Sequence, residues 1–258
     1  MFLSRPEIAV VEITGAIGGN IRSGEYSRLF RRLRDDPRTR AVLLEIDSPG
    51  GSAIASDYLY LSLLSLAKAK PLVAFVRGLG ASGGYYLACS AARIIASPGA
   101  IIGSIGVISV RPVLQELMSR IGVSVSVSKS GPLKDMGAPY KEPSLEELAK
   151  EEELIADLFQ RFVDIVATAR KMPEDRVREY ATGEIFLGTR AKEIGLVDET
   201  GDFDRALEIT AELAGVRPRY HYVRPRQPLF QRVLSPAGAA FARQLTVEVE
   251  SRLSRRYL

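Results

Sequence analysis

The chain has 258 residues, of which 46% are hydrophobic and 26% are charged, a balance typical of one large globular domain. The single cysteine, Cys89, and the single histidine, His221, exclude an intramolecular disulfide, a cysteine-based zinc cluster and a multi-histidine metal site. A serine-histidine-aspartate triad is disfavoured as well, since the lone histidine would have to be its base. The net charge is +4, but the stretch from Arg217 to Leu258 holds nine arginines and two glutamates, so the residues before it are net negative.

Short β-branched runs alternate with helical stretches over the first two thirds of the chain. The expected strands are Ile8–Ile13, Ala41–Ile46, Leu72–Val76, Arg93–Ala96 and Ile105–Ser109, and the expected helices are Tyr26–Arg34, Ala55–Ala69 and Tyr85–Ala92. Because the strands are almost entirely apolar and helices separate them, we expect an α/β fold with a parallel sheet covered by helices.

The following part of the chain is predicted to hold a further strand, a loop and a long helix. Val123–Ser128 alternates like a strand, and residues 129–143 form a Gly/Pro-rich loop that contains Lys134. Residues 144–147 match a capping box, which predicts the start of a long amphipathic helix that runs to about Arg170. This helix is expected to pack on the core or on a neighbouring subunit.

The C-terminal part is predicted to divide into a helix and a basic tail. After the helix at Asp204–Ala214, the main domain is expected to end at residue 215, so that it spans residues 1–215. Residues 216–258 form the arginine-rich tail, which is expected to be extended and then helical from Ala237. The tail is a candidate for peripheral contact with an anionic membrane, although a solvated tail fits equally well, and no nucleic-acid partner is expected.

The sequence also limits where the protein is expected to act. No apolar run reaches the roughly 18 residues of a transmembrane helix, and residues 1–6 are too short for a signal peptide. We therefore expect a cytoplasmic or membrane-associated protein.

Two glycine-rich turns, Asp47–Ser52 and Gly80–Gly84, each follow an apolar strand. Glycines at a strand-to-helix turn expose backbone N–H groups and allow a ligand to approach closely. If the two turns lie side by side at the carboxyl edge of the sheet, their N–H groups can converge on one oxygen and form an oxyanion hole. Neither turn has the spacing of a phosphate-binding loop, and a purely structural pair of turns is the alternative.

Ser82 lies in the second turn, in a setting similar to a nucleophile elbow, although a helix N-cap is its alternative role. A nucleophilic serine needs a base, and His221 lies far along the chain in the arginine-rich tail. A lysine can serve instead when its surroundings keep it neutral. Lys134 is a candidate because it lies in a Gly/Pro loop beside Leu133 and Met136.

Five sequence blocks carry a family resemblance, and they occur in the order found in that family. They are Asp47–Gly51, Ala81–Tyr86, Gly103–Ile108, Gly131–Asp135 and Gly195–Asp198. On these blocks the chain resembles the SppA-type signal peptide peptidases, the serine-lysine peptidases of family S49, in the fold superfamily of ClpP and crotonase. The resemblance implies a ClpP/crotonase-like peptidase domain over residues 1–215 and a ring assembly of single-domain copies.

The resemblance also implies roles for individual residues. Ser82 is similar to the family nucleophile, Lys134 to the general base, and Ser104 to the serine that orients the lysine. The base can act within its own chain or come from a neighbouring subunit, and the sequence leaves both possibilities open. No cofactor and no metal are implied.

The oxyanion hole is implied by the same resemblance. The Gly83 N–H is similar to one family donor, and either Gly50 or Gly51 is similar to the other. Removal of one such donor typically lowers the rate by about 100- to 1,000-fold.

The expected function is that of a serine endopeptidase that hydrolyses apolar peptides, such as released signal peptides or membrane-protein fragments. One alternative is a stomatin-partnered membrane-protein protease of the same family. A crotonase-type acyl-CoA enzyme is a second alternative, but such enzymes use carboxylates, and the turn around Ser82 contains no Asp or Glu. A catalytically inactive scaffold is the third, and an intact set of candidate catalytic residues speaks against it.

Overall fold

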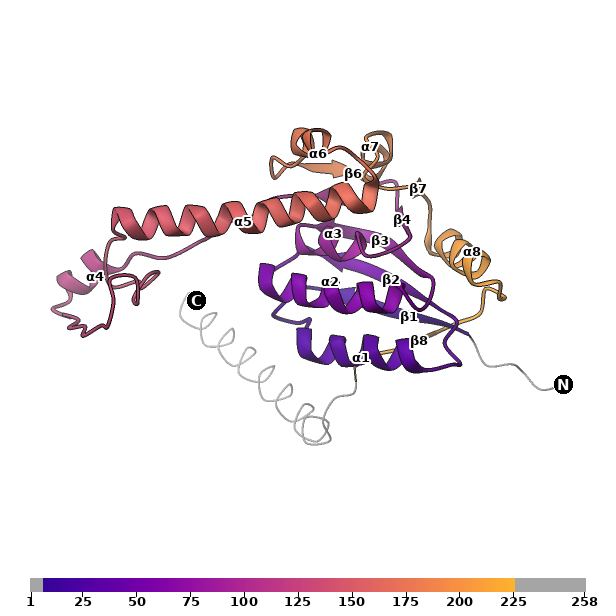
Figure 1. Cartoon of the computed structure of the whole chain (residues 1–258), viewed down its shortest axis with the longest axis horizontal. Coiled ribbons are helices and arrows are strands. Elements are labelled where there is room, and N and C mark those ends of the chain that lie inside the picture. The colour runs from indigo at the N-terminus through magenta and orange to yellow at the C-terminus, as the bar shows by residue number, and fades with distance from the viewer. Residues whose placement is uncertain (1–6, 226–258) are drawn as a thin grey trace, which may run out of the picture. The chain divides into compact units, whose positions relative to one another are not determined.

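The computed structural model describes residues 7–225, and residues 7–223 belong to one compact unit (Figure 1). Its strands are β1 (Ile8–Thr14), β2 (Ala41–Ser48), β3 (Leu72–Ala81), β4 (Arg93–Ala96), β5 (Ile101–Gly103), β6 (Ile185–Leu187), β7 (Glu199–Thr200) and β8 (Tyr220–Tyr222). Its helices are α1 (Ser23–Asp35), α2 (Ala53–Ala67), α3 (Gly83–Ala88), α4 (Gln115–Arg120), α5 (Leu145–Arg170), α6 (Glu174–Tyr180), α7 (Gly188–Glu193) and α8 (Phe203–Ala214).

The strands form one mixed sheet in which parallel pairs dominate. The order is β6-β5-β3-β2-β1-β8, and β4 pairs with both β3 and β7. Among the pairs in the described part of the chain, only β5 with β6 is antiparallel. The expected α/β fold with a largely parallel sheet is therefore confirmed.

Both faces of the central strands are buried, which explains their nearly continuous apolar sequence. One face packs against α1 and α2, where Val11 of β1 shares a cluster with Phe30 and Leu59. The opposite face packs against α8, where Val10 shares a second cluster with Leu207. Figure 1 shows α1 and α2 side by side over the sheet, with α8 beyond its other face.

The strand expected at Ile105–Ser109 is wrong, because the chain turns before that point. β5 ends one residue before Ser104, whose φ of 51° lies in the left-handed region that a strand does not use. The Ser104 N–H donates to the carbonyl of Glu184 (2.7 Å). The chain therefore leaves the β5–β3 ladder at this residue.

Val123–Ser128 has the expected alternation but no partner strand. The structure assigns this segment to no helix or strand, and its valines remain 45%, 46% and 43% exposed at positions 123, 125 and 127. A strand is stable when a neighbour pairs with its N–H and C=O groups. No strand within residues 7–225 supplies that pairing.

Residues 109–143 form an arm at the N-terminal end of α5, away from the sheet (Figure 1). The 26-residue helix α5 begins with the expected capping box, in which Ser144 Oγ accepts from the Glu147 N–H (3.2 Å). In return, Glu147 Oε2 accepts from the Ser144 N–H (2.9 Å). None of the helices in the described ranges combines the length and apolar character needed to cross a membrane.

The compact unit continues past residue 215, where the sequence analysis ends the main domain. β8 pairs in parallel with β1, with His221 opposite Ala9, and the unit includes Val223. His221 is exposed on this edge strand. The tail helix expected from Ala237 lies outside the described residues.

Candidate active site

The two glycine-rich turns lie against each other at the carboxyl edge of the sheet. β2 and β3 are adjacent parallel strands, and Ser48 pairs with Gly80 in their register. A Cβ atom on Gly50 would lie 2.6 Å from the Gly83 nitrogen and 2.8 Å from the Ser82 Cβ. Because Gly50 also has a φ of +93°, a glycine is required for this close approach.

Ser82 has a strained backbone at this strand-to-helix turn, with φ 50° and ψ −121°. Such conformations cost on the order of 1–3 kcal/mol and are concentrated at functional sites. The Ser82 N–H donates to the Gly103 carbonyl (2.8 Å), which ties the turn to β5. The side chain makes no capping hydrogen bond to α3, so the N-cap role is not realised and the hydroxyl remains available.

The N–H groups of Gly50 and Gly51 differ in their use. The Gly50 N–H donates to Ser48 Oγ (3.1 Å), and that hydroxyl donates to the Gly15 carbonyl (2.7 Å). The Gly51 N–H, like that of Gly83, has no hydrogen-bond partner among residues 7–225. Gly51 and Gly83 therefore have backbone donors available to a ligand, whereas the donor of Gly50 is already engaged.

Ser82 lies on a cavity of about 830 Å³ between the sheet edge, α2 and α5. Gly51, Gly83 and Ser104 line the same cavity. Much of the remaining lining is apolar, including Val107, Ile108, Ile155, Leu158, Phe159 and Phe162. A mostly apolar cavity with a few convergent polar groups is typical of a binding or catalytic site.

One polar group in this cavity is tied to two neighbours. Asp57 Oδ1 of α2 accepts from Tyr86 Oη (2.6 Å) and from Arg161 Nε of α5 (2.6 Å). Burial, followed by the hydrogen bond to Asp57, raises the pKa of Tyr86 and keeps its hydroxyl protonated. This link cannot be predicted from the sequence, because Asp57 and Arg161 are 104 positions apart and no local pattern connects them.

Lys134 does not line the Ser82 cavity. It is exposed and belongs to the arm, which Figure 1 shows at the end of α5 remote from the sheet. On α5, the cavity lining extends from Glu152 to Phe162, and Glu152 lies five residues, or about 7 Å of helix, beyond Glu147 near the arm. The single chain therefore brings Ser82 and Ser104 to one cavity without Lys134.

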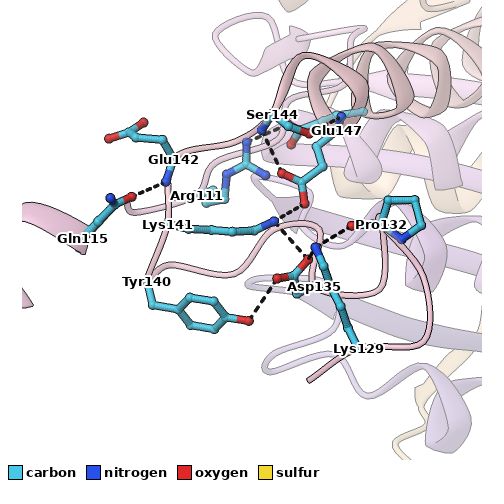
Figure 2. A network of polar contacts seen from close by, with 11 residues as sticks. Arg111, Gln115, Lys129, Pro132, Asp135, Tyr140, Lys141, Glu142, Ser144 and Glu147 are labelled. Carbon is cyan, nitrogen blue, oxygen red and sulfur yellow. Dashed lines mark hydrogen bonds and ion pairs between the residues drawn. The ribbon is translucent and has the colours of Figure 1, made fainter. Parts of the chain in front are cut away.

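The arm loop nevertheless distinguishes Lys134 from its neighbours. Lys129 and Lys141 both bind Asp135, at 2.8 and 3.0 Å, as Figure 2 shows. Hydrogen bonds to Glu147 and then Asp135 raise the pKa of Lys141, which keeps it protonated. The Lys134 backbone N–H donates to the Gly131 carbonyl (3.2 Å), whereas its side chain has no hydrogen bond or ion pair with any residue in the described ranges.

Comparison with known proteins places the chain in a family. The model of peptidase family S49 matches residues 65–217, more than half of the chain. The chain belongs to peptidase family S49. A Synechocystis sp. protein is 39% identical to this S49 chain over 215 residues, which are 83% of the chain and 77% of that protein. The SppA-type resemblance is confirmed by the chloroplastic serine protease SPPA of Arabidopsis thaliana, which is 32% identical over 82% of the chain.

The relatives differ in the share of their own length that the S49 chain covers. The match covers 33% of the Arabidopsis protein, so the chain spans about a third of that relative. A mutant of the 1510-N membrane-bound stomatin-specific protease resembles the chain in structure, with a TM-score of 0.55 over 87% of the chain. Its sequence identity is 17%, so this likeness supports the fold alone.

The last of the S49-like blocks, Gly195–Asp198, has a structural role. The Asp198 carboxylate accepts two hydrogen bonds from Arg170 at 3.0 Å each and one from the Ile94 N–H at 2.7 Å. Arg170 also donates to the Gly195 carbonyl (2.8 Å). These bonds hold the C-terminal end of α5 against β4 and thereby fix one wall of the cavity.

Two further kinds of reactive site, a cysteine nucleophile and a metal site, are absent from the described part of the S49 chain. Cys89 is buried, and burial raises the pKa of its thiol to about 12, so it remains protonated and unreactive. Across residues 7–225, no group of three His, Cys, Asp or Glu side chains is arranged to hold a metal ion.

Proposed function

We propose that this S49 chain is a serine endopeptidase in which Ser82 is the nucleophile and Lys134 the general base. Its substrates are apolar peptides, such as released signal peptides or membrane-protein fragments. The observation that carries the proposal is the strained Ser82, whose hydroxyl lies on an apolar cavity beside the unengaged N–H groups of Gly51 and Gly83.

In the proposed reaction, Ser82 Oγ attacks the carbonyl carbon of the scissile bond while its proton passes to the neutral amine of Lys134. The N–H groups of Gly51 and Gly83 donate to the carbonyl oxygen as it becomes negatively charged. The C–N bond then breaks, Lys134 protonates the leaving amine, and an ester forms on Ser82. Water, deprotonated by Lys134, hydrolyses this ester and regenerates the serine. Ser104 hydrogen-bonds the lysine amine and orients it.

The proposed lysine comes from a neighbouring copy in a ring. The arm lies away from the Ser82 cavity of its own chain, and it carries apolar side chains that one chain leaves uncovered. Val110 is 83% and Ile121 is 66% exposed. Because exposed apolar surface of this kind marks interaction sites, burial of the arm against a second copy would deliver Lys134 to that copy's Ser82.

The substrate class can be tested by mass spectrometry. The apolar cavity lining predicts that the protein cleaves an apolar, signal-peptide-like peptide and leaves a polar peptide of equal length intact. The fragment masses identify the cleaved bonds. Equal cleavage of both peptides would contradict the proposed specificity, and an intact apolar peptide under all conditions would contradict the peptidase assignment.

The pH dependence of cleavage tests the proposed lysine base. Only a neutral amine accepts a proton, so kcat/KM is expected to rise from about pH 6 towards about pH 10 while the protein stays folded. Measurement of kcat/KM across this range, with circular dichroism at each pH to verify folding, gives the profile. A flat profile would rule out a lysine base.

A further inference from the structure

Four charged side chains, those of Lys129, Asp135, Lys141 and Glu147, interact directly after Lys134 in the sequence, where Asp135 lies (Figure 2). Lys129 Nζ donates to Asp135 Oδ1 (2.8 Å) and to the Pro132 carbonyl (2.8 Å), which closes the turn on one side. Lys141 Nζ donates to the same Asp135 oxygen (3.0 Å) and to Glu147 Oε1 (2.5 Å). Asp135 is thus the centre of a cluster that spans the whole loop.

This cluster is joined to the start of α5. The Glu147 side chain is 1% exposed, and its second oxygen accepts from the Ser144 N–H in the capping box. One carboxylate therefore caps the helix and holds Lys141 at the same time. These bonds fix the loop to the first turn of the 26-residue helix α5.

The charges in the cluster are balanced. Hydrogen bonds from Lys129 and Lys141 lower the pKa of Asp135 to about 2, so its carboxylate is ionised at any pH relevant to catalysis. Two ammonium groups and two carboxylates cancel. The other polar neighbours are the Tyr140 hydroxyl, 3.5 Å from Asp135, and the nearby Arg111–Glu151 ion pair at 3.1 Å.

Lys134 directly precedes Asp135 but takes no part in this cluster. We propose that Asp135, Lys141 and Glu147 are positioning residues for the Lys134 amine. In this arrangement, Lys129 and Lys141 bind the Asp135 carboxylate, so that it does not bind the neighbouring Lys134. This inference rests on the proposed function, because it concerns how the proposed base is positioned. If Lys141 is removed, the Asp135 carboxylate loses one partner and attracts the Lys134 amine, which then stays protonated to higher pH.

Two substitutions separate this role from simple support of the loop. Lys141→Gln is expected to lower kcat about tenfold or more near neutral pH, to leave KM within about twofold, and to move the pH–rate profile to the alkaline side. Lys141→Arg is expected to restore the wild-type profile. Asp135→Asn removes the carboxylate that could bind the Lys134 amine. We therefore expect a lower kcat and a pH–rate profile that is not displaced to the alkaline side. An alkaline displacement in Asp135→Asn equal to that in Lys141→Gln would overturn the inference.

Lys150→Gln is the matched control, since Lys150 lies on α5 and pairs only with Glu153 in the described structure. It is expected to retain the wild-type kcat and pH profile. Thermal unfolding of each variant verifies that it is folded.

A second measurement does not depend on peptidase activity. Acetylation of Lys134 by acetic anhydride, followed by mass spectrometry across a pH series, reports how much of its amine is neutral. Slower acetylation near neutral pH in Lys141→Gln than in the wild type supports the inference, and equal rates contradict it. If the wild type cleaves no peptide, the proposed function fails, while this labelling result still decides whether the cluster controls the lysine.

Discussion

Mixing the Ser82→Ala and Lys134→Ala variants is expected to restore peptide cleavage that neither variant shows alone. Each variant lacks one member of the proposed pair, so each is expected to lose essentially all measurable cleavage. In a mixed ring, a Lys134→Ala copy contributes Ser82 and its Ser82→Ala neighbour contributes Lys134. Random assembly of equal amounts would complete about a quarter of the sites.

The measurement is the cleavage rate after the two variants are dissociated together and allowed to reassemble, with the assembly state verified by size-exclusion chromatography. The matched control mixes Ser82→Ala with the double variant Ser82→Ala/Lys134→Ala, which has no intact serine and must stay inactive. Absence of recovery in properly reassembled mixtures would place the lysine and the serine in the same chain. Substantial cleavage by either variant alone would contradict the proposed pair.

Gly50→Ala is expected to lower kcat/KM by about 100- to 1,000-fold, although the Gly50 N–H is not the proposed donor. The added methyl group would lie 2.6 Å from the Gly83 nitrogen and 2.8 Å from the Ser82 Cβ. Since Gly50 also has a positive φ, the turn must shift, and the Gly83 donor would move with it. The readouts are kcat/KM and the thermal unfolding midpoint.

Gly99→Ala is the control for this substitution, because a Cβ on Gly99 meets no atom within 4 Å and the residue has no positive φ. It is expected to keep wild-type activity. If folded Gly50→Ala also kept its activity within a few fold, the contact between the two turns would have no role in catalysis.

Features that arise from a local pattern could be predicted from the sequence. The apolar strands beside the two turns, the capping box at Ser144 and the available serine at position 82 each depend on neighbouring residues alone. The adjacency of the turns follows from these, since consecutive parallel strands usually lie side by side. The site at the carboxyl edge of the sheet was therefore foreseeable.

Features that depend on distant contacts could not be predicted in this way. The expected strand at 105–109 fails because Ser104 adopts a left-handed conformation, held by the Glu184 carbonyl 80 positions later. The choice between Gly50 and Gly51 depends on the Ser48 hydroxyl, which engages one of the two N–H groups. The place of Lys134 depends on the direction in which α5 runs relative to the sheet, which no motif spacing encodes.

Helix α5 carries part of the cavity wall along its middle, from Glu152 to Phe162, and the arm at its N-terminal end. Under the proposed mechanism, this division makes an isolated chain a latent protease whose activity depends on its assembly. Newly made copies would remain harmless to surrounding proteins until enough of them accumulate to assemble. Proteolysis would then rise more steeply than in proportion to protein concentration, and simple dilution would switch it off.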